Sequence, residues 1–250
     1  MDMTDRKAEL AANLAKVEER IAAACAAAGR EREDVTLIVV TKTYPASDVR
    51  ILSELGVRHV AENRDQDAAP KAAACSDLPL TWHFVGQLQT NKVRSVLGYA
   101  DVVQSVDRSR LVAALSKEAV RAGRELGCLI QVALDAADPQ ASSPPGEQAV
   151  GERGGVAPGG IEELAGLVAA APGLRLDGLM TVAPLAGEYA GRQRAAFERL
   201  MDLSTDLRRV HPAANMVSAG MSADLEQAVA AGATHVRVGT AVLGVRPRLG

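Results

Sequence analysis

The sequence is poor in aromatic residues and has no excess of charge of either sign. Two Phe, three Tyr and one Trp in 250 residues leave too few rings to stack bases along a nucleic-acid strand. Lys and Arg total 28 against 31 Asp and Glu, so the basic excess typical of nucleic-acid-binding proteins is absent. We therefore expect no nucleic-acid partner.

Cysteine is scarce and long apolar runs are missing. Cys25, Cys75 and Cys128 are odd in number and far apart, without the paired spacing of a zinc site or a disulfide framework. Residues 1–9 lack the basic and then apolar order of a signal peptide, and no run is long enough to span a bilayer. We expect a cytoplasmic protein that binds no metal and no membrane.

What the chain does contain is one amphipathic helix followed by alternating strands and helices. The helix is indicated by apolar residues at spacings of three and four, Leu10, Leu14, Val17, Ile21 and Cys25, and should end near Gly29. Short apolar runs then predict strands at residues 35–41, 57–61, 80–85, 101–106, 128–134, 176–182, 216–219 and 234–238. Helices are predicted between them at residues 46–55, 64–74, 89–97, 108–125, 160–171, 190–210 and 222–231.

This alternation predicts the fold. It requires parallel strands with right-handed crossovers, and eight such units indicate an α/β protein with a (β/α)8 TIM barrel. The barrel would be one domain over residues 1–250, with its N-terminal helix within 1–29. An open doubly wound sheet competes, but the first strand–helix turn lacks a Gly-x-Gly-x-x-Gly fingerprint, and polar residues are spread over many strand ends.

Residues 135–158, which include four prolines, interrupt the alternation after the fifth strand. A segment of this length is either a lid over the barrel mouth or a flexible, disordered insertion. The insertion is favoured, because the segment carries almost no apolar residues with which to dock.

Lys42 follows the first predicted strand, where an amine would be held between a packed interior and solvent. Burial disfavours the ammonium form of a lysine and lowers its pKa, so that the amine can attack a carbonyl and form a Schiff base. A solvated charge is the more ordinary interpretation of a lysine at a strand end. The choice between a reactive amine and a solvated charge depends on the residues at the other strand ends, which meet at the working face of a barrel.

The last two strands end in sequences suited to an anion. The seventh runs into Ser218-Ala219-Gly220-Met221-Ser222, and the eighth presents Arg237-Val238-Gly239-Thr240. Glycine allows close approach of the backbone, and helix-terminal amides with Ser or Thr hydroxyls bind phosphate. A reactive amine and this anion site, facing each other, would together bind a phosphorylated aldehyde. Pyridoxal 5′-phosphate is the common cofactor with both an aldehyde and a phosphate.

Six motifs occur in order along nearly the whole chain. They are VTKT at 40–43, ENR at 62–64, WHFVGQLQTNK at 82–92, GLMTVAP at 178–184, SAGMSAD at 218–224 and VRVGT at 236–240. Together they resemble the pyridoxal phosphate homeostasis protein family, with the motif at 82–92 the most diagnostic. The resemblance implies a fold-type III barrel like the N-terminal domain of alanine racemase. Because the sequence stops shortly after the eighth strand, we expect it to lack the C-terminal β-domain of the racemases.

Matching positions imply roles for individual residues. The resemblance implies that pyridoxal phosphate is held as an internal aldimine on Lys42, that Ser218, Gly239 and Thr240 bind its phosphate, and that Arg237 faces its pyridine nitrogen. It also implies a pocket lined by Asn63, His83, Met180, Met221 and Ser222. A guanidinium beside the ring nitrogen stays charged and discourages protonation of the ring, which weakens the cofactor as an electron sink.

The sequence departs from the family pattern at three places. Ala61 stands where relatives commonly have Gly, and Ala219 where they have Met, and both changes are small enough to leave the ligand groups in place. The Lys-x-Gly stretch of the family after strand five is replaced by Arg153-Gly154-Gly155.

The resemblance favours a protein without catalytic residues that stores, delivers or buffers pyridoxal phosphate. Enzymes that use the cofactor, in their apo form, would be recipients, and a monomer is favoured over an obligate dimer. Racemisation needs proton transfer on both faces of the substrate, and Tyr44, Tyr99 and Tyr189 match no racemase tyrosine motif. The alternative is a Schiff-base enzyme, an amino-acid racemase or an aldolase, with His83 as its acid/base. A scaffold without a cofactor is a third possibility.

Ordinary structural explanations compete at several of these positions. Taken alone, His83 fits a hydrogen-bonded core histidine better than a ligand, and only the surrounding motif reverses that preference. His59, His211 and His235 are given structural roles. Met180 and Met221 could simply fill the core. Glu62 is also expected to be structural, paired with Arg64 or another cation at the rim.

Overall fold

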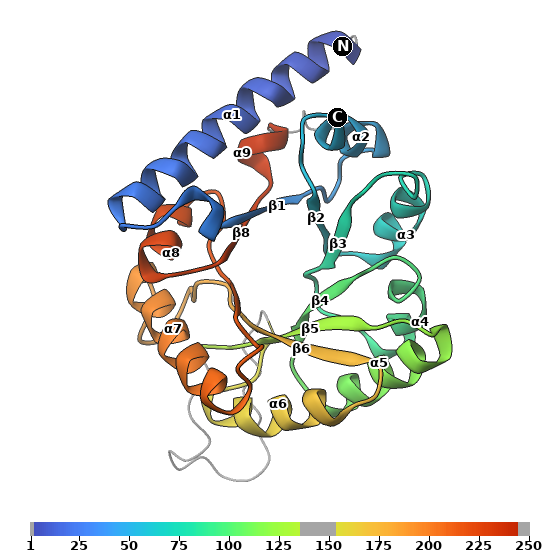
Figure 1. The fold of residues 1–250 in the computed structure, drawn as a ribbon, viewed down its shortest axis with the longest axis vertical. Coiled ribbons are helices and arrows are strands. Elements are labelled where there is room, and N and C mark those ends of the chain that lie inside the picture. The colour runs from blue at the N-terminus through green and yellow to red at the C-terminus, as the bar shows by residue number, and fades with distance from the viewer. Residues whose placement is uncertain (1–2, 136–153, 245–250) are drawn as a thin grey trace.

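The computed structural model describes residues 3–135 and 154–244, and eight parallel strands close there into a barrel ringed by helices (Figure 1). The strands are β1 (Thr36–Val40), β2 (His59–Glu62), β3 (Thr81–Phe84), β4 (Val102–Val106), β5 (Leu126–Gln131), β6 (Leu174–Met180), β7 (Met216–Ser218) and β8 (His235–Val238). Each strand pairs with the next, and β8 pairs with β1, so that the sheet has no free edge. The predicted TIM barrel and all eight predicted strands are confirmed.

Helices follow the strands as the periodicity predicts. They are α1 (Met3–Ala27), α2 (Ala46–Glu54), α3 (Asp65–Ala73), α4 (Val93–Val96), α5 (Ser109–Ala122), α6 (Ile161–Ala170), α7 (Gln193–Val210), α8 (Leu225–Ala231) and α9 (Thr240–Leu243). The helix predicted at 89–97 is divided into a 3-10 turn, η2 (Thr90–Lys92), and α4. Two further 3-10 turns, η1 (Arg32–Asp34) and η3 (Pro158–Gly160), precede β1 and α6, and neither these turns nor α9 was predicted.

Strand β5 begins at Leu126, two residues before the predicted start at residue 128. The apolar pattern gave too late a start for this strand because it is interrupted by Gly127, and glycine is typical of turns. In the barrel, a Cβ on Gly127 would come 2.2 Å from the Asp177 carboxylate of β6. Glycine is therefore needed inside this strand so that an acidic side chain can approach its backbone closely.

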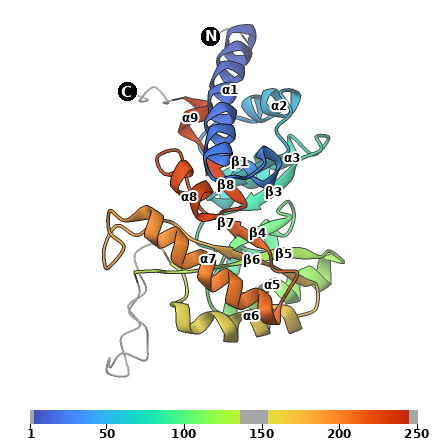
Figure 2. The same ribbon diagram turned by 60° about the vertical axis from the view of Figure 1, so that its left-hand side comes forward.

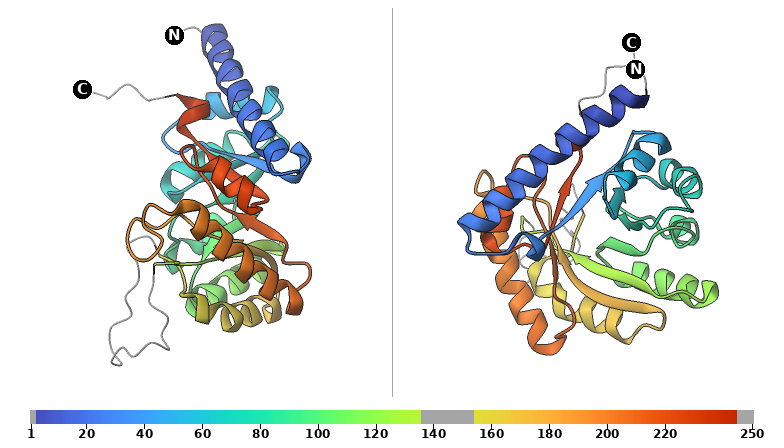
Figure 3. Two further views of the ribbon diagram at one scale, coloured as in Figure 1. Left: turned by 90° about the vertical axis from the view of Figure 1, so that its left-hand side faces the viewer. Right: turned by 45° about the horizontal axis from the view of Figure 1, so that its top comes forward.

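The helix α1 lies across the outside of the barrel where the sheet closes, beside α8 and α9 (Figures 2 and 3). Its apolar stripe is buried as predicted, with Leu10 and Ile21 fully covered. Two side chains of α1 bind the carbonyls of α9: Asn13 Nδ2 donates to Val242 O at 3.2 Å and Arg6 Nη2 donates to Leu243 O at 3.0 Å. Gly29 follows the helix at φ +67°, close to the predicted end.

Of the insertion expected at 135–158, residues 136–153 lie outside the described residues. Its last part is firmly attached to the barrel. Val156 pairs with the chain beyond β5, since its N–H donates to Gln131 O at 2.8 Å and its carbonyl accepts from Ala133 N at 2.9 Å. Val156 therefore forms one isolated parallel bridge with Val132, just after β5, which the expectation of a flexible segment did not foresee.

No helix within residues 3–135 and 154–244 combines the length and the apolar character needed to cross a membrane. In the same residues no group of His, Cys, Asp and Glu side chains is arranged to hold a metal ion. The three cysteines are free and buried.

The ends of β2 and β3 touch at Gly86, and this contact provides a test of the fold. A Cβ at this position would stand 2.0 Å from Asn63 O, a backbone atom that cannot move without displacing the end of β2. We expect Gly86→Ala to lower the free energy of unfolding by about 1–3 kcal/mol through overpacking. Equilibrium unfolding in urea measures the change.

The matched control is Gly166→Ala in α6, where an added Cβ meets nothing within 4 Å. Because Ala is a better helix former than Gly, this variant should gain about 0.5–1 kcal/mol. A Gly86→Ala protein as stable as the parent would show that the two strand ends are not in contact.

Candidate functional site

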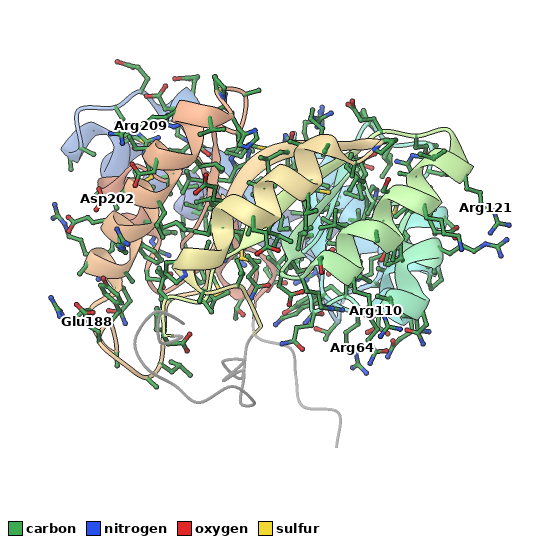
Figure 4. All side chains as sticks on the ribbon, turned by 90° about the horizontal axis from the view of Figure 1, so that it is seen from below. Arg64, Arg110, Arg121, Glu188, Asp202 and Arg209 are labelled. Carbon is green, nitrogen blue, oxygen red and sulfur yellow. The ribbon has the colours of Figure 1, made fainter. Side chains whose placement is uncertain are left out.

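The parallel barrel brings the carboxyl ends of all eight strands to one face, the mouth. In Figure 4 the labelled residues Arg64, Arg110 and Glu188, which follow β2, β4 and β6, all lie along the lower side. Arg209, near the end of α7, lies at the opposite side. The polar residues predicted to follow the strands therefore belong to a single surface, as the barrel prediction requires.

Lys42 lies in the turn that follows β1, at this mouth. Its side chain is exposed, so the expectation that it is held partly in a packed interior is wrong. The reason is that Thr41, the residue before it, turns into the protein and is fully buried, and the chain then leaves the barrel. The next residue, Thr43, has φ +71° and is the one non-glycine residue at positive φ in residues 3–135 and 154–244. Such strain is found mostly at functional sites.

The end of β8 lies directly beside the end of β1. The register pairs Val39 with Val238, and a Cβ on Gly239 would come 3.2 Å from Val40 O. Gly239 precedes the short helix α9, whose first residue, Thr240, is exposed. The first amides of a helix have no acceptor within it. Lys42 and the group Gly239–Thr240 therefore follow adjacent strands at the same mouth.

The turn after β7 adds Ser222, which is half-buried, to this part of the mouth. The turn depends on Gly220 at φ +87°, where a Cβ would come 2.6 Å from the Ala228 methyl carbon. Met221 N donates to Asp224 Oδ1 at 2.6 Å, which fixes the turn ahead of α8. The Met221 side chain itself is exposed.

Below the mouth a chain of hydrogen bonds crosses the barrel interior. Arg237 Nη1 on β8 donates to Ser218 Oγ at 2.6 Å, and Ser218 Oγ donates to Gln104 Oε1 on β4 at 2.7 Å. Gln104 Nε2 lies 3.0 Å from His83 Nδ1, and His83 Nε2 lies 3.1 Å from His59 Nδ1. Because β7 and β4 are not neighbours, these bonds pass through the interior of the barrel.

The histidines of this network are held neutral. Burial is the main reason that the pKa of His83 lies well below its usual value, with smaller electrostatic contributions from His59, His235 and Arg237. Burial also lowers the pKa of His59, and it lowers that of His235 to about 4. Gln104 donates to Nδ1 of a neutral His83, whose Nε2 proton then points to His59.

The surroundings of His83 are those of a core residue. The side chain is 1% exposed and both ring nitrogens have partners, so His83 is a hydrogen-bonded core histidine. An acid/base must reach its substrate, and no free ring nitrogen is presented to the mouth. Met180 is likewise buried, with Val102 and Leu129.

Ser218 differs from what a phosphate ligand requires. Its hydroxyl is fully buried, accepts from Arg237 and donates to Gln104, so that binding a phosphate would break one of these bonds. Ser222 and Thr240, both accessible at the mouth, have no such commitment of their hydroxyls among the described residues.

Arg237 is the charged group of the network. It is 4% exposed, and its Nη2 donates to Thr181 O at 2.8 Å. Burial lowers its pKa to about 10, so it remains charged at neutral pH. No carboxylate among the described residues forms a salt bridge with it. Within the barrel its charged form is favoured by the Asp224 carboxylate, and its hydrogen bonds go to Ser218 and to Thr181 O.

Asn63 lies after β2 and lines a cavity of about 270 Å³ at the rim. The other lining residues are Arg64, Asp65, Gln66, Phe84, Gln87, Leu88, Gln89 and Lys92. Glu62 does not pair with Arg64, which lies 3.8 Å from Asp67 instead. Its partner is Lys71 of α3, which the sequence interpretation missed.

Gln104 and Lys71 were missed although the sequence carried a signal for each. Gln104 stands with Ser105 between valines in a strand that is buried throughout, so its amide had to face other polar groups. Lys71 falls on the buried side of α3 together with Ala68 and Ala72. A lysine on a buried helix face requires a buried partner.

Comparisons with known proteins agree with this geometry. The family model of the alanine racemase N-terminal domain matches residues 12–247. The pyridoxal phosphate homeostasis protein of Mycobacterium tuberculosis is 40% identical over 261 aligned positions, covering 97% of this chain and 95% of that protein. That of Escherichia coli K12 is 35% identical, covering 95% and 97%.

Among solved structures, PipY of Synechococcus elongatus with pyridoxal phosphate bound is similar with a TM-score of 0.75 and 31% identity. The similarity covers 94% of this chain and 100% of PipY. Alanine racemase of Corynebacterium glutamicum, at 15% identity and a TM-score of 0.62, shows the shared fold alone. It covers 98% of this chain but 62% of the racemase chain.

The buried histidines make stability depend on pH. Their pKa values are lower in the folded state than the usual 6.5, so the unfolded chain takes up protons that the folded chain refuses. This contribution is complete above pH 6.5 and is lost as the pH falls toward the folded value, about 4 for His235. Each proton that only the unfolded chain binds adds about 1.4 kcal/mol per pH unit to the decrease in unfolding free energy.

Urea unfolding of the parent and of His235→Gln between pH 7 and pH 5 measures this effect. As the pH falls, we expect the unfolding free energy of the parent to decrease more steeply than that of the variant. The difference in slope should be at most about 1.4 kcal/mol per pH unit, the value for one proton. Equal slopes would mean that His235 is protonated in the folded barrel.

Proposed function

Because the chain belongs to the pyridoxal phosphate homeostasis protein family, with an alanine racemase N-terminal domain, we propose that it binds pyridoxal 5′-phosphate and acts in the homeostasis of this cofactor. Storage, delivery and buffering are the forms that this function takes. Enzymes that need the cofactor are the proposed recipients. The cytoplasm is the proposed location, where the free, buried cysteines stay reduced.

The observation that carries the proposal is the pairing of β1 with β8, which brings the turn that contains Lys42 close to Gly239 and Thr240. The cofactor has an aldehyde at one end and a phosphate at the other, so it needs an accessible amine and a group of anion donors a short distance apart. The mouth offers both. Its donor set therefore fits the cofactor.

Each residue of the site then has a proposed task. Lys42 Nζ holds the aldehyde carbon covalently, while the amides of Gly239 and Thr240 and the hydroxyls of Thr240 and Ser222 hold the phosphate. Arg237, charged and without a carboxylate salt bridge among the described residues, would face the ring nitrogen. Asn63 and Met221 flank the ring from the mouth. Ser218, with His83 and Met180 beneath it, holds the arginine in place.

The same residues favour binding over catalysis. Bound pyridoxal phosphate supplies an electron sink whose strength depends on protonation of its ring nitrogen, and a charged guanidinium there opposes that protonation. The one histidine of the predicted pocket has both ring nitrogens engaged. We therefore assign no catalytic residue to the chain.

Covalent labelling tests the attachment site. Purified protein incubated with pyridoxal phosphate and reduced with borohydride should carry the label on the peptide containing Lys42, and Lys42→Ala should lose it together with the visible absorption of the complex. Lys92→Ala, which changes another exposed amine of the rim, is the control and should be labelled like the parent. If Lys92 of the parent protein carried the label, the attachment site would be Lys92 and not Lys42.

A turnover assay tests the absence of catalysis. The loaded protein, incubated with L-alanine or with β-hydroxy amino acids, should form no D-alanine and no aldol cleavage products above the level of free cofactor. Chiral chromatography of the mixture gives the measurement. Sustained turnover that disappears in both Lys42→Ala and His83→Gln would establish the enzyme alternative.

A further inference from the structure

Thr41, the residue that precedes Lys42, is held by side chains from two other elements. Its N–H donates to Ala61 O at 2.9 Å, which continues the pairing of β1 with β2. Its hydroxyl donates to Glu62 Oε1 at 2.6 Å, and its carbonyl accepts from Lys71 Nζ at 2.7 Å. All three polar groups of this residue are therefore bound, and the residue is fully buried.

The two side chains that hold Thr41 form a buried ion pair. Lys71 Nζ donates to Glu62 Oε1 at 2.5 Å, and the side chains are 7% and 0% exposed. Glu62 Oε1 thus receives both the Thr41 hydroxyl and the Lys71 ammonium, and the same ammonium binds the Thr41 carbonyl. The three residues form a closed ring of hydrogen bonds, so none of them can shift without the others.

This ring lies one peptide bond from the backbone of Lys42, the residue that carries the amine. Thr41 O, the acceptor of Lys71, belongs to the peptide group that contains the backbone nitrogen of Lys42. On the far side of Lys42, Thr43 is held at φ +71°, a conformation that costs energy and persists only where neighbouring structure enforces it. The ring of Thr41, Glu62 and Lys71 is a rigid anchor on one side of this strained turn.

Lys71 itself is unsuited to bind the cofactor, although it is a second lysine close to Lys42. Its side chain is buried, and its ammonium already donates to Glu62 and to Thr41. The ion pair also gives the mouth no net charge. Its evident effect on the site is geometric.

We propose that Lys71 and Glu62 are positioning residues for Lys42, which fix the Thr41 peptide so that the Lys42 amine leaves the barrel in one direction, toward Gly239 and Thr240. This inference rests on the proposed function. When a change elsewhere in a protein misplaces a reacting group by about 1 Å, the rate falls by up to about 100-fold. The anchor should therefore govern how fast Lys42 captures an aldehyde.

The test compares rates of covalent capture. The double variant Lys71→Met, Glu62→Gln removes both charges together, because removing one would leave the other buried and unpaired. The rate of pyridoxal phosphate binding at Lys42 is followed by absorbance, at a temperature where circular dichroism shows every variant to be folded. We expect capture to be about 10- to 100-fold slower than in the parent, with the label still on Lys42.

The matched control is a lysine–glutamate pair on the surface. Lys7 Nζ lies 2.7 Å from Glu54 Oε2, with both side chains at least half exposed, and the double variant Lys7→Met, Glu54→Gln should capture at the parent rate. Thr41→Val keeps the buried ion pair and removes only the hydroxyl, so it should fold and show several-fold slower capture. Lys71→Arg keeps the charge and should recover part of the rate that Lys71→Met, Glu62→Gln loses.

The outcomes separate this inference from the proposed function. If the parent carries no label on Lys42, the proposed function fails. If the parent is labelled there and both Thr41→Val and the folded double variant capture at the parent rate, the positioning role is overturned while the function stands. If the double variant does not fold, Thr41→Val decides alone, and an unchanged rate in that variant overturns the inference.

Discussion

The hydrogen bonds between β1 and β8 are the constraint on which the rest of the site depends. They join the two strands that are farthest apart in the chain, with Thr36 opposite His235 and Val39 opposite Val238. Because the strands are parallel, their carboxyl ends meet, and an amine after the first strand comes to lie beside a glycine after the last. Neither residue makes a site alone. In an open sheet with these strands at opposite edges, the same residues would be separated by its full width.

The barrel interior supports this mouth with polar groups where many barrels have apolar layers. Burying the guanidinium of Arg237 and the imidazole of His83 is costly unless their hydrogen bonds are made. Here Ser218 and the Thr181 carbonyl bind the guanidinium, Gln104 and His59 bind the imidazole, and His83 stays neutral beside the cation. The network fixes the direction of Arg237 and leaves its charge uncompensated by any carboxylate salt bridge in the described part of the chain. Polar residues that look like candidates for chemistry thus serve largely to orient one side chain.

Much of the fold was predictable from the sequence, because short apolar runs alternate with segments of helical periodicity. Gly127 misled the start of β5, since its role depends on Asp177 of the next strand, which no local pattern reveals. The mouth was predictable because strand ends in a barrel converge. How deep a residue lies within the barrel was not predictable. Ser218 and Ser222 look alike in the sequence, and only the strand register places Ser218 in the interior network and Ser222 at the surface. The partner of Glu62 was missed because α3, not the rim, delivers the cation.

The helix α1 has a consequence for how the protein is made. It precedes β1 in the chain, yet its side chains bind Val242, Leu243 and Glu226, more than 200 positions later. Contacts of such sequence separation form late in folding. The barrel wall between β1 and β8 therefore closes only after β8 has been synthesised, and Lys42 cannot meet Gly239 before then.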